Sequence, residues 1–191
     1  YIVRDQVFAN AQTGNIVLLS QHIFAGNWAD VMRYLMPVLS FMFGVAAATE
    51  IRQHFQNIGR IHWRQIVILI EMSMLFLVGF LPGKMDLVAN AFVSFSCAMQ
   101  VQTFRKVDSY AFASTMCIGN IRSGMEALCA YRQSHNRQIL YKAFHYFGII
   151  ILFAFGAGIG SILIPVFNLQ TIWFSSFLLM VGFFLMFIQE K

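Results

Sequence analysis

Long runs of apolar residues, separated by short polar stretches, dominate the hydrophobic pattern of the chain. A helix needs about 20 apolar residues to cross the ~30 Å hydrocarbon core of a bilayer. The pattern predicts five such helices, at Val31–Ala48, Ile66–Leu81, Leu87–Thr103, Ala143–Val166 and Ile172–Ile188. The third gives the weakest signal, because Asn, Ser and Gln interrupt it. We therefore predict an all-α integral membrane protein, a helical bundle with five spans visible in this sequence.

Composition supports this class. Hydrophobic residues make up 59% of the chain and charged residues 11%, whereas soluble domains carry about 25% charged residues. A soluble fold of this size could not bury so much apolar surface. The three cysteines, Cys97, Cys117 and Cys129, lack the spacing of a metal site or a disulfide framework. We therefore expect no metal and no cofactor.

The charged residues cluster between the apolar runs and predict an orientation, because Lys and Arg accumulate in cytoplasmic loops. The segments Glu50–Arg64 and Arg105–Lys142 have a basic excess, whereas the short loops Pro82–Asp86 and Pro165–Thr171 have no net charge. We expect the first pair to be cytoplasmic and the second pair to face outside. The C-terminus is then cytoplasmic, and the net charge of +5 reflects topology rather than nucleic-acid binding.

Three pairs of similar segments occur in the same order along the chain, which indicates an internal repeat. The pairs are Gly14-Asn15-Ile16 with Gly119-Asn120-Ile121, FMFGVAAA (41–48) with FAFGAGIG (153–160), and LFLVGFL (75–81) with LLMVGFF (178–184). We predict one membrane domain, 1–191, made of a first repeat at 1–84 and a second at 85–191.

The two repeats are expected to have opposite orientations in the membrane. The second begins with the span Leu87–Thr103, for which the first has no counterpart, so we expect a sixth span upstream of Tyr1 in the native chain. Copies with three spans each must insert in opposite directions. The charge pattern agrees, because it places Gly14 toward the outside and Gly119 toward the inside. Inverted-topology repeats are common among transporters.

Short motifs in both halves resemble those of the YoaK-like family of uncharacterised bacterial multi-pass membrane proteins. Gln12–Asn15 matches a Thr-Gly-Asn segment, and Ala98–Gln100 followed by Arg105 resembles an element of the second half. Val101 departs from the Asn that is usual in the family, and Ile118 departs from the usual Thr. The resemblance spans essentially the whole chain. It implies the bacterial cytoplasmic (inner) membrane and no particular activity.

The two Gly-Asn steps are the first candidates for a functional site. Glycine readily adopts a left-handed conformation and Asn tolerates it, so such a step in an apolar segment predicts a helix break. Non-helical backbone at membrane depth must face protein or water. The breaks either line a central site or are helix C-caps packed against a neighbour. The candidate lining residues here are Thr13, Gly14, Asn15, Thr115, Gly119 and Asn120.

Glu71 is the most distinctive single residue, because it lies about 10 Å into the second predicted span, seven residues after Arg64. Intramembrane carboxylates are costly and are usually functional. Gln100 on the next span lies at a similar depth and joins the candidates. The alternative is a protonated or hydrogen-bonded Glu71 that only holds helices together. The aligned residue of the second repeat is Phe174, so Glu71 breaks strict symmetry.

These features favour a transporter-like carrier of an unidentified small solute or ion. The alternative is a non-catalytic accessory or partner-binding subunit without a transport cycle. We do not expect an enzyme, because no Ser/His, His/Glu or paired-Asp constellation supports one. The expected partners are membrane lipids and a small solute or ion, with a homo-oligomer left open and no nucleic acid.

Overall fold

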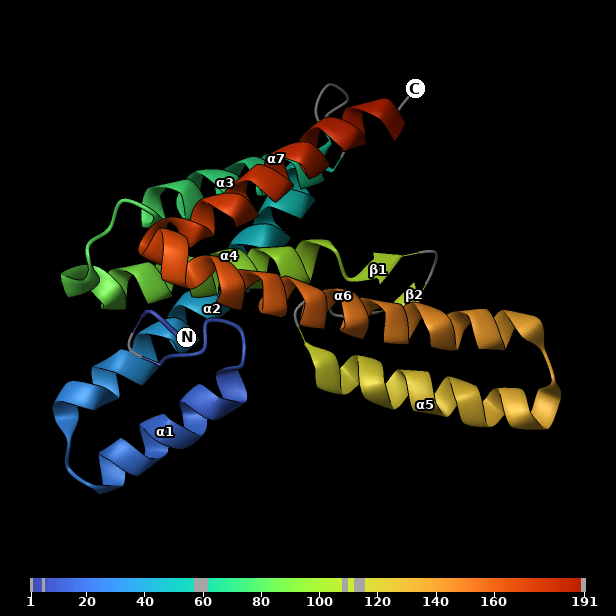
Figure 1. The fold of residues 1–191 in the computed structure, drawn as a ribbon, viewed down its shortest axis with the longest axis horizontal. Helices are drawn as coiled ribbons and strands as arrows, with labels where there is room; N and C mark the ends of the chain where they lie inside the picture. Colours follow the sequence, from blue (N-terminus) through green and yellow to red (C-terminus); the bar gives the residue numbers. More distant parts are fainter. Residues whose placement is uncertain (1, 5, 57–61, 108–109, 112–115, 190–191) are drawn as a thin grey trace. The chain divides into compact units, whose positions relative to one another are not determined.

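A computed structural model describes residues 2–4, 6–56, 62–107, 110–111 and 116–189, and it is α-helical apart from one small hairpin. The chain divides into two compact units, Tyr1–Thr103 with Ile164–Lys191, and Phe104–Leu163 (Figure 1). We describe each unit by itself. Their boundaries differ from the repeat boundary between residues 84 and 85, which stays a prediction.

The first unit contains most of the helices (Figure 1). Its elements are α1 (Gln12–Phe24), α2 (Trp28–Phe55), α3 (Trp63–Val78), the 3-10 turn η1 (Gly83–Met85), α4 (Asp86–Thr103), the end of α6 (Arg137–Phe167), the 3-10 turn η2 (Asn168–Thr171) and α7 (Ile172–Gln189). Four of the predicted spans coincide with α2, α3, α4 and α7, within a few residues at most ends.

The turns between these helices follow from local sequence. After α1, Gly26 adopts a left-handed φ of 71°, and the Asn27 N–H reaches back to the His22 carbonyl at 3.0 Å. This glycine C-cap reverses the chain so that α1 packs on α2. A capping box begins α3: the His62 ring accepts from the Arg64 N–H, and the Gln65 side chain accepts from the His62 N–H.

The closest helix packing joins α2 to α4. A Cβ built at Gly44 of α2 would lie 2.5 Å from the Phe95 carbonyl oxygen and 2.7 Å from the Ala98 Cβ. Only a glycine therefore allows the two backbones to approach this closely, which is how helices pack in membranes. The buried apolar cluster beside this contact contains Ala48, Trp63, Val67 and Met99.

A second, antiparallel pair is formed by α3 and α7, which lie side by side (Figure 1). Trp173 Nε1 donates to the Phe76 carbonyl at 3.0 Å, and Ser176 Oγ donates to the Met72 carbonyl at 3.4 Å. The Trp173 indole lies against Gly79, where a Cβ would be 2.0 Å from Nε1. Beside the contact is a groove of about 400 Å³, with Ser73 and Ser176 among its lining residues.

The second unit consists of a hairpin, α5 (Cys117–Ser134) and most of α6. In the hairpin, β1 (Lys106–Val107) pairs antiparallel with β2 (Tyr110–Ala111). The α5 helix ends at His135, which has a left-handed φ of 51°.

The helices α5 and α6 then run antiparallel (Figure 1). Their contact is close at Gly124 of α5, where a Cβ would lie 3.1 Å from the Phe147 ring of α6. Asn120, Gly124 and Ala127 recur at helical spacing and form the buried face of α5.

By length and composition, two stretches among the described residues are able to cross a membrane, Trp28–Phe55 and Arg137–Met186. They contain the first and fourth predicted spans and most of the fifth. The α3 and α4 helices do not meet the same criterion, because α3 is short and α4 is interrupted by polar residues. The five-span topology therefore stays a prediction, as do the sixth span and the inverted repeats.

Candidate functional site

The two Gly-Asn steps lie inside the first turns of α1 and α5, which begin at Gln12 and Cys117. Neither Gly14 nor Gly119 has a left-handed φ; among the described glycines only Gly26 does. The left-handed helix break that we expected at these glycines is therefore wrong. Both glycines occupy ordinary helical backbone near the N–H groups that a first turn leaves unpaired.

Asn15 anchors the start of α1 to two other helices. Its side chain is fully buried, and Nδ2 donates to the Phe8 carbonyl at 2.6 Å and to Gln12 Oε1 at 2.9 Å. Gln12 Nε2 donates in turn to Ser94 Oγ of α4 at 2.9 Å, and Ser94 Oγ donates to the Pro37 carbonyl of α2 at 2.7 Å. The network therefore joins α1, α4 and α2. Sequence reasoning selected Asn15 but missed Gln12.

The second Gly-Asn step has a similar local arrangement. Asn120 is buried, and its Nδ2 donates to the carbonyl of Met116, the residue before α5, at 3.2 Å. In both helices, therefore, a buried Asn in the first turn binds backbone just upstream. The neighbouring candidates Thr13 and Gly119 are exposed, and Thr115 lies outside the described residues.

Glu71 lies in the middle of α3 and is 1% exposed. Its Oε1 is buried and has no hydrogen-bond partner among the described residues. Cys97 of α4 lies within electrostatic range of the carboxylate. Gln100 follows Cys97 by one helical turn, and its Oε1 is likewise buried without a partner in the described part of the chain. Both predicted candidates therefore have a buried side-chain oxygen without a partner among the described residues, on the neighbouring helices α3 and α4.

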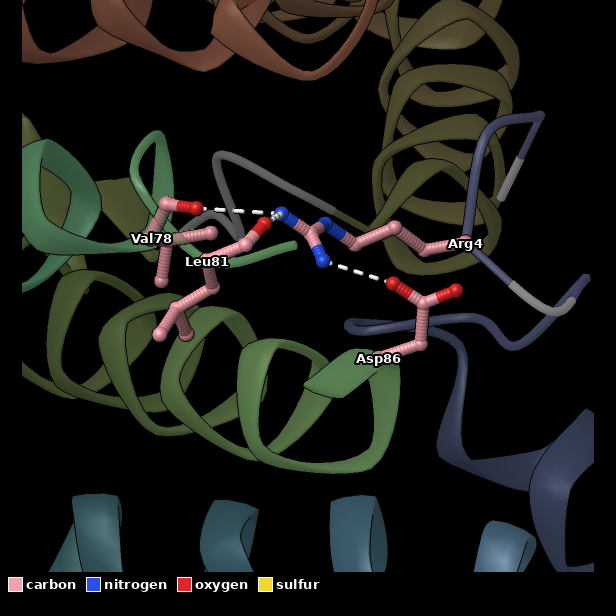
Figure 2. A network of polar contacts seen from close by, with 4 residues as sticks. All are labelled: Arg4, Val78, Leu81 and Asp86. Carbon is pink, nitrogen blue, oxygen red and sulfur yellow. Dashed lines mark hydrogen bonds and ion pairs between the residues drawn. The ribbon is translucent and has the colours of Figure 1, made fainter. Parts of the chain in front are cut away.

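Arg4 and Asp86 form a buried ion pair that sequence reasoning missed (Figure 2). Arg4 Nη1 donates to Asp86 Oδ1 at 2.6 Å. Its Nη2 donates to the carbonyls of Val78 and Leu81 at 3.0 and 2.9 Å. The N-terminal segment is thereby fixed to the end of α3 and to the first residue of α4.

A cavity of about 200 Å³ lies beside this ion pair. Its polar lining residues are Arg4, Asn90, Asn168, Thr171 and Ser175, and its apolar walls include Val7, Val78, Val93, Ile164 and Ile172. Thr171 Oγ1 is buried and has no hydrogen-bond partner among the described residues. The cavity thus lies where the two short loops that we predict to face outside come together.

Glu71 lies below this cavity on the same face of α3. Val78 lines the cavity, and Leu75 and Glu71 follow at helical spacing, both buried. Seven residues of helix span about 10 Å. Leu75 therefore lies between the cavity wall and the carboxyl group. Among the described residues, no group of three or more His, Cys, Asp and Glu could hold a metal ion.

Comparison with protein families gives one informative match. The model of a family described as "Protein of unknown function (DUF1275)" matches residues 1–185. The chain belongs to this family. The expectation of an uncharacterised family is thereby confirmed, although the description does not include the YoaK name and states no activity. Neither the comparison with curated proteins nor that with solved structures gives a match.

Proposed function

We propose that this DUF1275 protein is a multi-pass protein of the bacterial inner membrane that carries a small solute or ion, and that Glu71 binds the coupling cation or proton. The buried carboxyl group of Glu71 is the observation on which the proposal rests. A buried polar group without a partner costs about 1–3 kcal/mol. A purely structural anchor gains nothing from such a group unless it is paired, whereas a carrier needs it for a ligand that comes and goes.

The surroundings of Glu71 support this role. Cys97 supplies a further polar atom from α4, and Gln100 Oε1, one helical turn further along α4, also has no hydrogen-bond partner among the described residues. Carboxylate and amide oxygens are acceptors that suit a cation or a proton donor. The cavity at the outer end of α3 lies about two helical turns from Glu71 on the same helix face, with Leu75 between them.

Inverted repeats, with a sixth span upstream of Tyr1, are part of the proposal. The starts of α1 and α5 are 105 residues apart, like the two Gly-Asn steps. Ser73 and Ser176 each lie two residues before the matched segments that begin at Leu75 and Leu178, and both line the groove between antiparallel α3 and α7. Antiparallel helices related by a two-fold axis bring equivalent residues together where they cross. The crossing of α3 and α7 near Ser73 and Ser176 therefore supports the proposed two-fold relation between these helices.

The decisive experiment is electrical. Protein reconstituted in proteoliposomes on a solid-supported membrane would be exposed to jumps of erythritol, acetamide, glycine, acetate or methylammonium. We expect at least one of these solutes to evoke a transient current that Glu71→Gln abolishes. Phe174→Leu, at the aligned position of α7, is the matched control and should retain the current. An accessory subunit gives no current with any solute, and full current in Glu71→Gln removes Glu71 from the site.

Topology can be tested separately. In a variant without the three native cysteines, a cysteine at Asn136 should resist a membrane-impermeant maleimide applied to sealed cells. A cysteine at Leu169, in the loop expected outside, should react. The opposite pattern would reverse the orientation that the basic loops predict.

A further inference from the structure

We propose that the cavity beside Arg4 is the solute site and that its ligand is a small neutral solute with several hydroxyl or amide groups, such as a short polyol. This inference rests on the proposed transport function and specifies its substrate class. It uses residues other than Glu71.

The charge balance of the described lining favours a neutral ligand. Among the described residues, Arg4 is the one ionisable side chain in the lining, and its positive charge is matched by Asp86 at 2.6 Å. Both side chains are nearly buried, at 8% and 12% exposure. A carboxylate ligand would have to displace Asp86 and leave it as an uncompensated buried charge, which is strongly unfavourable. A neutral ligand leaves the ion pair intact.

The remaining polar groups match a ligand that both donates and accepts hydrogen bonds. Asn90 and Asn168 are amides, and Thr171 and Ser175 are hydroxyls. Amide and hydroxyl groups each supply donors and acceptors. Thr171 Oγ1 is buried beside the cavity without a hydrogen-bond partner in the described chain. A hydroxyl of the ligand would satisfy it and remove the penalty for leaving it unpaired.

The apolar walls and the position of the cavity complete the argument. Aliphatic side chains such as Val7, Val78 and Ile172 line the rest of the cavity, and they suit the carbon backbone of a polyol or an alkyl amide. Few precisely placed polar groups in an otherwise apolar cavity are the usual form of a small-molecule site. Because Glu71 lies beyond Leu75 on the same helix face, a neutral solute and a coupling cation would occupy separate sites.

The test is a binding measurement on the whole protein in a detergent that contains no phosphatidylglycerol. Erythritol and acetamide should raise the unfolding temperature, whereas acetate, glycine and methylammonium at equal concentration should not. Thr171→Val should weaken erythritol binding about fivefold, the effect of one lost hydrogen bond, and Ser175→Ala is a second variant should the first not fold. Ser73→Ala, which lines the other groove, should bind erythritol like the native protein.

Several outcomes would overturn the assignment. Protection by acetate or glycine but not by erythritol would show that the Arg4–Asp86 pair opens to take a charged ligand. Stabilisation by phosphatidylglycerol alone would assign the hydroxyl groups to a lipid headgroup. If erythritol binds through Thr171 but evokes no current, the site stands and the transport proposal fails. If a charged solute evokes a current that Thr171→Val does not change, transport stands and this site fails.

Discussion

The helices α3 and α7 overlap one of the three pairs of similar segments, yet they differ in how much of their surface is buried. The α3 helix packs on both α4 and α7 and buries a continuous face that includes Val67, Glu71 and Val78. In α7, Ser176 is the one buried side chain among residues 172–186. Burial therefore depends on the neighbours that each copy acquires, and similar sequences do not guarantee it.

The aligned residues of α3 and α7 differ in polarity as well as in burial. The copy with neighbours on two sides has Glu71, whereas the exposed copy has Phe174, 43% exposed, at the aligned position. A carboxylate that faces lipid would be costly, but a carboxylate enclosed by protein can be used. Of these two similar helices, only the enclosed one has an ionisable group at the aligned position.

The largest difference in stability between matched substitutions in α3 and α7 is expected at the aligned glycines, Gly79 and Gly182. Gly79→Ala should destabilise the protein by about 3 kcal/mol, because the new Cβ collides with Trp173 and breaks its hydrogen bond to Phe76. Gly182 is the matched control; a Cβ there meets nothing within 4 Å. Gly182→Ala should be neutral or slightly stabilising. Thermal unfolding in detergent measures both, and equal effects would show that the indole does not pack on α3.

The next largest effect is a gain in stability. Glu71→Leu should stabilise the protein by about 2 kcal/mol, because it removes a buried polar group that lacks a partner. It should also abolish the solute-evoked current. Phe174→Leu, the counterpart in α7, should change stability little. A marked loss of stability in Glu71→Leu would instead identify the carboxyl as a structural anchor.

A smaller effect is expected from the indole itself. Trp173→Phe keeps an aromatic ring but removes the hydrogen bond from Nε1 to the Phe76 carbonyl, at a cost of about 1 kcal/mol. Trp28, at the start of α2, is 68% exposed, so Trp28→Phe serves as the control and should be neutral. Chemical unfolding followed by circular dichroism separates the two. A neutral Trp173→Phe would mean that the α3–α7 contact depends on shape alone.

The smallest effects are expected at the matched serines. Ser73 Oγ donates within its own helix to the Leu69 carbonyl, whereas Ser176 Oγ crosses to the Met72 carbonyl over a long 3.4 Å. Ser73→Ala and Ser176→Ala should each change stability by less than about 0.5 kcal/mol. A loss well above this value in only one variant would show that the crossing is not symmetric.

Hydropathy alone predicted most of the fold, because each predicted span lies largely within a helix of the structure. The α1 and α5 helices were not anticipated as separate elements, since the sequence around Gly14 and Gly119 mixes polar and apolar residues and suggested a break. Helices do begin next to Gly14 and Gly119, but neither glycine has the left-handed conformation that we expected. A buried Asn in a first turn binds the chain upstream of it, which sequence alone cannot distinguish from a left-handed turn.

The candidate site was accessible only in part. The burial of Glu71 could be predicted because a single carboxylate stands in an apolar run. The Arg4–Asp86 pair could not, because 82 residues separate the partners, and each has an oppositely charged neighbour in sequence, Asp5 and Lys84. The lack of a hydrogen-bond partner for Thr171 Oγ1 among the described residues could not be predicted either, because it depends on packing between segments that are distant in sequence.

The reach of Arg4 also has a consequence for biogenesis. Arg4 is synthesised before its three acceptors, at Val78, Leu81 and Asp86, which follow some eighty residues later. If helices enter the membrane as they are synthesised, the N-terminal segment must wait unanchored until α4 has begun to emerge. The Arg4 anchor then forms only after α3 has been made, and slow insertion of the α3–α4 hairpin would leave a lone guanidinium exposed to quality-control machinery.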